Sequence, residues 1–178
     1  MRLRELDVPG VWLVEGRPEQ DERGTFVRHF DREVFAGAGL CTAWDQGSSS
    51  LNRRAGTLRG MHWQAAPHEE TKLVRCVHGA IHDVVLDLRD GPTYGRWAAV
   101  ELDEDDARAL YIPPGCAHGF QTLRDDSVVS YLIATPYVEG LARGVRWDDP
   151  AFAIAWPPPP PGGLIISERD RTHPLVGG

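Results

Sequence analysis

Short runs rich in β-branched and aromatic residues, separated by turn signals, constrain the fold of this chain more than any other feature. The turns include His78-Gly79, Asp90-Gly91-Pro92 and Pro113-Pro114-Gly115. The runs that we predict as strands are residues 10–15, 24–30, 72–77, 80–88, 96–102, 109–112, 119–123 and 128–135. Many short strands at this spacing predict an all-β sandwich or barrel, with a double-sheet jelly roll among the options. One short helix is expected over 31–39.

The length of 178 residues predicts a single domain, 1–178, large enough to bury its own core. Residues 157–163 (PPPPPGG) cannot form a central strand or a helix interior. The next segment, 164–170, is apolar and then charged. We therefore expect the C-terminal tail, 157–178, to pack back on the body.

Charge and composition exclude several classes of function. The formal net charge is −7, whereas a general nucleic-acid binder needs a basic face. No run of about 18 apolar residues predicts a membrane span, and the start of the chain does not resemble a secretory signal. The three cysteines form neither a CxxC zinc pattern nor a disulfide framework. We expect a cytoplasmic protein that contacts neither nucleic acid nor membrane.

The segment 80–89 leaves two interpretations open. By the strand period of two, Ile81, Asp83, Val85 and Asp87 share one face, and the other face is mostly apolar. The acidic face could simply be the wetter side of a strand. It could instead line a polar barrel interior.

Two stretches concentrate side chains that could carry chemistry. The first, 56–64 (GTLRGMHWQ), holds Arg59, His62 and Gln64, and Lys72 follows it. The second, 111–120 (YIPPGCAHGF), presents His118 just after a turn. A cupin metal site would need a second histidine two residues after His62, where Gln64 stands. We therefore expect no metal and no other cofactor.

Taken together, the motifs resemble those of the dTDP-4-dehydrorhamnose 3,5-epimerase family across nearly the whole chain. The matching stretches, in the family's order and spacing, are DERGTF (21–26), 46–52, GTLRGMHWQ (56–64), 71–89, PTYG (92–95), YIPPGCAHGFQTL (111–123), Tyr131, Tyr137, 144–157 and SERD (167–170). The resemblance implies a double-sheet jelly-roll (cupin) barrel with short peripheral helices. It also implies an isomerase that epimerises C3, C5 or both of a nucleotide-linked 4-keto-6-deoxyhexose through an enolate. A homodimer is implied as well.

The resemblance also assigns roles to individual residues. His62 would be the base, oriented by Asp170, and histidine side chains exchange protons near neutral pH. Tyr131 would return the proton on the opposite face, and Lys72 would stabilise the enolate oxygen. The residues implied in substrate binding are Arg23, Phe26, Gln46, Ser48, Arg59, His118, Tyr137, Arg143 and Arg169.

Three positions depart from the family pattern. Ser48 stands where the family usually has Asn, and Arg28 and Ala142 stand where Glu is common. These departures concern substrate contacts, so the base, the sugar and the carbons epimerised stay open. Two other functions also stay open: a metal-dependent cupin oxygenase or isomerase, and a non-catalytic sugar-binding cupin.

Overall fold

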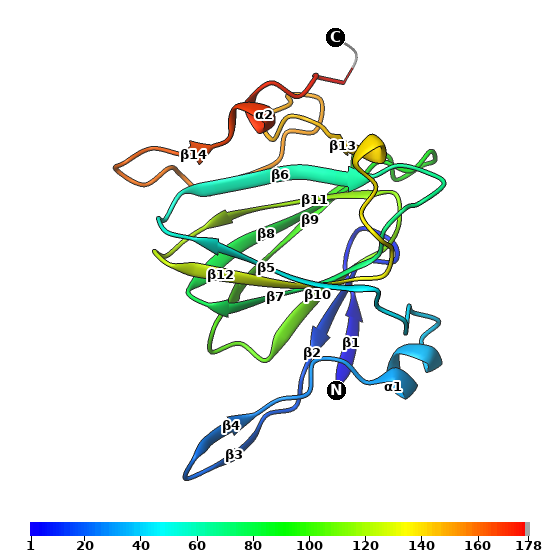
Figure 1. Cartoon of the computed structure of the whole chain (residues 1–178), viewed down its shortest axis with the longest axis vertical. Helices are drawn as coiled ribbons and strands as arrows, with labels where there is room; N and C mark the ends of the chain where they lie inside the picture. Colours follow the sequence, from blue (N-terminus) through cyan, green and yellow to red (C-terminus); the bar gives the residue numbers. More distant parts are fainter. Residues whose placement is uncertain (177–178) are drawn as a thin grey trace.

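The computed structural model of the chain describes residues 1–176, and its two main β-sheets face each other to form a barrel (Figure 1). The first sheet has the strand order β1 (Arg2–Glu5), β2 (Trp12–Glu15), β10 (Arg108–Ile112), β7 (Lys72–His78), β12 (Ser127–Ile133) and β5 (Gln46–Asn52). The second has the order β13 (Ala142–Gly144), β6 (Thr57–Gln64), β11 (Cys116–Thr122), β8 (Ala80–Asp87) and β9 (Trp97–Asp103). The prediction of an all-β double-sheet barrel is confirmed.

The smaller elements lie around this barrel. β3 (Glu19–Asp21) and β4 (Gly24–Phe26) form a separate hairpin that extends away from the two sheets (Figure 1). The other elements are α1 (Arg32–Gly37), the 3-10 helix η1 (Glu139–Leu141), β14 (Ile165–Ile166) and α2 (Glu168–Arg171). No helix within residues 1–176 is long and apolar enough to cross a membrane.

The core between the sheets explains the alternation in β8. Ile81 and Val85 are fully buried there, in one cluster with residues of both sheets. Asp83 is on the same face and is also fully buried, so this face does line the barrel interior. The opposite face, with Val84 and Leu86, is apolar because the segment around Phe152 covers it. Both faces of β8 are therefore buried.

Sequence propensity located most of these elements but missed some. The helix expected over 31–39 forms as α1, with the Asp31 carboxylate accepting hydrogen bonds from the first-turn amides of Glu33 and Val34. The strand expected over 24–30 ends at Phe26. β5, which reads QGSSSLN, was not expected because Gly and Ser have low β propensity. Its full register against β12 makes it a strand.

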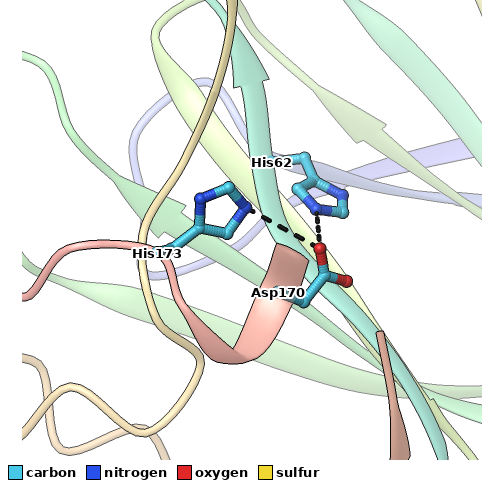
Figure 2. A group of neighbouring side chains, drawn as sticks. All are labelled: His62, Asp170 and His173. Carbon is cyan, nitrogen blue, oxygen red and sulfur yellow. Dashed lines mark hydrogen bonds and ion pairs between the residues drawn. The ribbon is translucent and has the colours of Figure 1, made fainter. Parts of the chain in front are cut away.

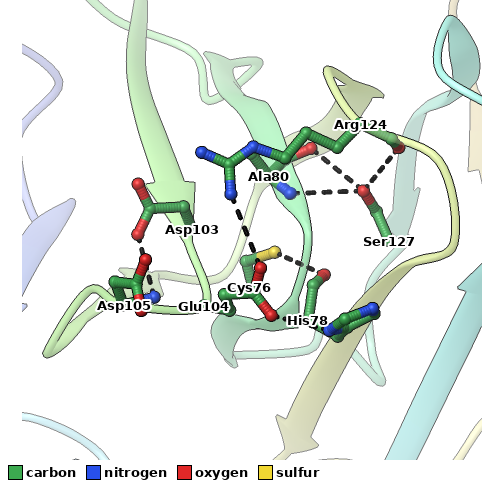
Figure 3. A network of polar contacts seen from close by, with 8 residues as sticks. All are labelled: Cys76, His78, Ala80, Asp103, Glu104, Asp105, Arg124 and Ser127. Atoms are coloured by element: carbon green, nitrogen blue, oxygen red, sulfur yellow. Dashed lines mark hydrogen bonds and ion pairs between the residues drawn. The ribbon is translucent and has the colours of Figure 1, made fainter.

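The hairpin turn at Gly79 is held by a network of polar contacts around the end of β7 that is remote from Lys72 (Figure 3). The Ser127 hydroxyl bridges the backbone of Ala80 and Arg124. Glu104 binds both His78, at 2.6 Å, and Arg124, at 3.5 Å. His78 and His82 do not converge on a common site, because His82 packs against Trp156 instead. These contacts hold the strands together at this end of the barrel.

Candidate active site

A cavity of about 690 Å³ lies between the two sheets and under the C-terminal tail. Its size falls in the range of small-molecule sites. β5, β7 and β12 of the first sheet form one wall, and β6 and β11 of the second form the other. β14 pairs in parallel with β6, so that residues 165–170 close the cavity from the tail side.

His62 and Asp170 form a direct pair at this cavity, although 108 residues separate them (Figure 2). Nε2 of His62 is 2.8 Å from Oδ1 of Asp170. With Nε2–H donating to the carboxylate, Nδ1 of His62 is left unprotonated and can accept a proton. Burial alone would raise the pKa of Asp170, but hydrogen bonds from His62, Gly60 and Ser167 and the His62 charge lower it overall. Asp170 is therefore a stable anion beside the imidazole.

A β-bulge in β6 determines which side chains of this strand face the cavity. His118 pairs with His62 and Phe120 pairs with Arg59, so two residues of β6, Gly60 and Met61, lie opposite Gly119 alone. Arg59 and His62 both line the cavity as a result, although they are three positions apart. A regular strand would send them to opposite faces. The Gly60 N–H also donates to Oδ2 of Asp170, at 3.2 Å.

We expect Gly60→Ala to lower the free energy of unfolding by about 2–4 kcal/mol, a fall in Tm of about 5–15 °C. Gly60 has a φ of +128°, and an added Cβ would lie 2.5 Å from the Gly119 Cα. Thermal unfolding followed by circular dichroism measures the effect. Gly37→Ala is the matched control, because that Cβ meets nothing within 4 Å. Equal Tm values for the two variants would contradict the close approach of β6 and β11.

Tyr131 lies on the wall opposite His62. It belongs to β12 of the first sheet, whereas His62 belongs to β6 of the second, and both line the same cavity. Burial raises the pKa of Tyr131, and the Asp83 carboxylate raises it further. The phenol therefore keeps its proton at neutral pH and is available as a donor.

His118 and Asp83 form a second, fully enclosed pair. Nε2 of His118 is 2.6 Å from Oδ1 of Asp83, and both side chains are buried. The His118 ring contacts Tyr131 edge-to-face, with centroids 6.1 Å apart. Asp83 thus fixes His118 against the floor of the cavity beside Tyr131.

Lys72 has a carboxylate partner in the cavity. Its Nζ is 2.8 Å from Oε1 of Glu70, and both side chains are about nine-tenths buried. The pair keeps the ammonium positioned while part of its charge is already balanced. Sequence reasoning did not select Glu70, which lies just before β7, although its position two residues before Lys72 was a usable signal.

Most of the other predicted substrate-binding residues gather at the same place. Ser48, Arg59 and Arg169 line the main cavity, and Nε of Arg59 donates to Oδ1 of Asn52 at 2.8 Å. Tyr137 and Arg143 line a smaller adjoining cavity of about 160 Å³, which also has His62, Glu70 and Arg169 in its wall. Tyr137 lies beyond the end of β12 at Ile133, so it is not on the same strand as Tyr131.

Three predicted residues are not brought into the cavity of this chain. Arg23 and Phe26 belong to the exposed β3–β4 hairpin, where Arg23 pairs with Asp21. Phe26 lines a separate surface pocket and is 66% exposed. Gln46 is hydrogen-bonded to the backbone instead, since its Oε1 accepts a hydrogen bond from the Tyr137 N–H at 3.1 Å.

One group of potential metal ligands exists within residues 1–176, and it comprises His62, Asp170 and His173 (Figure 2). His118 does not belong to the group and is bonded to Asp83. Sequence reasoning did not select His173. Its position three residues after Asp170, just past α2, places it beside the carboxylate.

Comparisons with known proteins agree with this arrangement. The sequence model of the family described as dTDP-4-dehydrorhamnose 3,5-epimerase matches residues 5–177. A dTDP-4-dehydrorhamnose 3,5-epimerase of Sinorhizobium fredii is 39% identical over 99% of this chain and 90% of its own length. A dTDP-4-dehydrorhamnose 3-epimerase of Streptomyces niveus is 39% identical, over 99% of this chain and 84% of its own.

A solved structure extends the similarity to the fold. The dTDP-4-dehydrorhamnose 3,5-epimerase of Bacillus anthracis, with TDP and PPi bound, superposes with a TM-score of 0.92. It is 36% identical and covers 98% of both chains. On the evidence of sequence, fold and cavity together, this chain belongs to the dTDP-4-dehydrorhamnose 3,5-epimerase family.

Proposed function

We propose that this chain epimerises C3, C5 or both of a dTDP-linked 4-keto-6-deoxyhexose, by removing a proton and returning it through an enolate. One observation carries the proposal: a proton acceptor, His62, and a proton donor, Tyr131, line one cavity from its two facing sheets. Inversion of a carbon needs a base on one face of the sugar and an acid on the other. The family membership of the chain supplies the substrate class.

In the first step, Nδ1 of His62 takes the proton from the carbon next to the ketone. The imidazole becomes positively charged, and the Asp170 carboxylate 2.8 Å from Nε2 stabilises that charge. A positioned general base of this kind contributes about 10²–10⁴-fold. The bulge at Gly60 supports the step by holding the other oxygen of Asp170.

In the second step, the enolate is stabilised and then protonated from the other face. The Lys72 ammonium lines the cavity and stabilises the negative charge that develops on the enolate oxygen. Tyr131 then donates its hydroxyl proton to carbon and recovers one from solvent, while His62 releases to solvent the proton that it took. His118 orients the sugar between them, which its rigid pairing with Asp83 supports.

The nucleotide diphosphate requires cations at the mouth of the cavity. Arg59 and Arg169 line it, and guanidinium groups bind phosphate oxygens through paired hydrogen bonds. Ser48 lies on the same wall, and Tyr137 and Arg143 border the adjoining cavity. The acidic net charge of the whole chain does not oppose this, because the contact is local.

The test is NMR of dTDP-4-keto-6-deoxyglucose in deuterated water with the enzyme. We expect deuterium to appear at C3, at C5 or at both, with formation of the inverted product. The carbon that exchanges identifies the position of epimerisation. A metal-dependent cupin would instead lose all turnover on chelation, and a binding module would bind the sugar nucleotide without any exchange.

We also propose that the protein is a homodimer in which Arg23 and Phe26 reach the partner's cavity. The exposed β3–β4 hairpin and the open edge strand β1 support this, because unpaired strand edges favour pairing with another chain. Light scattering should give about twice 19.7 kDa.

Subunit mixing tests the shared site directly. Arg23→Ala and His62→Ala should each lower activity when expressed alone, whereas a co-expressed mixture should recover activity. One cavity of each mixed dimer then contains both an unsubstituted His62 and an unsubstituted Arg23. A fully active monomer, or a mixture no more active than its parts, would contradict the proposal.

Two further properties are proposed on simpler grounds. The chain forms one domain over 1–178, which is supported within residues 1–176 by the pairing of β14 with β6 and the contact of Asp170 with His62, whereas residues 177–178 lie outside the described part. A reducing cytoplasm suits the three free cysteines, of which Cys76 and Cys116 are buried.

A further inference from the structure

His173 lies beside the His62–Asp170 pair, outside the lining of the sugar cavity. Its Nε2 is 3.7 Å from Oδ1 of Asp170, the same oxygen that His62 contacts. The His62 and His173 rings meet edge-to-face, with centroids 5.8 Å apart. The His173 ring packs over Gly144, where an added Cβ would lie 2.2 Å from Nε2. His173 is not part of the cavity lining.

Nε2 of His173 has no role in the proposed mechanism. Nε2 of His173 is buried and has no hydrogen-bond partner within residues 1–176. A buried nitrogen without a partner is costly unless it binds something. The nitrogen points at two other groups that share its chemistry as metal ligands (Figure 2).

We propose that His62, Asp170 and His173 form a zinc site whose occupation switches off the epimerase, an inference that rests on the proposed role of His62. Nε2 of His62, Oδ1 of Asp170 and Nε2 of His173 all lie within 4.8 Å of one another. Two histidines and a carboxylate are a common zinc set, and tetrahedral coordination at ordinary bond lengths spaces ligand atoms about 3.4 Å apart. The observed spacings of 2.8 and 3.7 Å bracket that value.

The surroundings also hold the ligands in place. The Gly60 N–H donates a hydrogen bond to Oδ2 of Asp170 and leaves Oδ1 for the metal. Such supporting hydrogen bonds orient metal ligands in proteins. The His62 side chain is 39% exposed, so one ligand of the group is reachable from the cavity.

Inhibition follows from the tautomer of His62. The free enzyme carries the proton on Nε2, where it bonds to Asp170, and Nδ1 is the base. Zinc on Nε2 displaces that proton and leaves the neutral ring protonated on Nδ1. The ring then has no free nitrogen to accept a proton from the sugar. Because His173 is not part of the cavity lining, zinc should lower kcat by about 10²-fold or more with little change in KM.

The test uses the chelator-treated, metal-free full-length protein and zinc as the probe. Calorimetry should show one zinc per chain, and cobalt should give the absorption of a tetrahedral site. Deuterium incorporation into the substrate should fall as zinc is added and recover on chelation. Magnesium at equal ionic strength is the control, because it prefers oxygen ligands and should do neither.

The matched variant is His173→Phe, which keeps a ring over Gly144 and removes the ligand nitrogen, with His173→Gln as a second variant should the first not fold. We expect metal-free activity close to that of the unmodified chain and a zinc dissociation constant at least about 100-fold higher. The calorimetric result does not depend on turnover, so it separates failure of the metal site from failure of the proposed function. Absence of zinc binding, or equal zinc affinity in the folded variants, would overturn the proposal.

Discussion

His62→Ala should abolish both solvent exchange at the substrate carbon and formation of the inverted product. In the proposed mechanism no enolate forms without the base, so neither outcome can occur. The expected loss is at the upper end of the range for a general base, about 10⁴-fold. Deuterium incorporation and product formation are measured by NMR on the same samples.

A matched control separates the chemistry from the loss of a histidine as such. His78 is exposed and bonds Glu104 in the network around the Gly79 turn, where it does not line the cavity. His78→Ala should therefore retain turnover, with folding of both variants checked by circular dichroism. If His62→Ala exchanged deuterium at the rate of the unsubstituted protein, the base would be another residue and the mechanism would be refuted.

Tyr131→Phe should separate the two outcomes that His62→Ala removes together. His62 can still take the proton and return deuterium to the face from which it came, so some exchange should persist. Net inversion should fall by about 10²–10⁴-fold, because the donor on the opposite face is gone. Only a hydroxyl is lost from a partly buried ring, so folding should be little changed.

Tyr94→Phe is the control for this substitution. Tyr94 is 45% exposed, packs against Phe152 and does not line the cavity, so its hydroxyl should be dispensable. Normal inversion by Tyr131→Phe would show that the proton comes from another donor. Tyr137, in the adjoining cavity, would then be the next candidate.

The sequence by itself determined the fold class and the candidates for the reacting groups. Alternating apolar residues and regular turn signals specified most strands, because they reflect local backbone preference and burial. The stretches around His62, His118 and Asp170 carried the family pattern. Propensity could not reveal β5, whose serines and glycine become a strand only through pairing with β12.

The tertiary structure alone decided how these groups meet. Parity along β6 sends Arg59 and His62 to opposite faces, and the bulge at Gly60 brings them to one. Asp170 reaches His62 only because β14 joins the edge of β6 and carries the tail over the cavity. The partners Glu70 and Asp83, and the placement of His173, follow from contacts made when the sheets and tail pack together. Local sequence encodes the conformation of each strand, whereas contacts between distant segments depend on packing that no single segment contains.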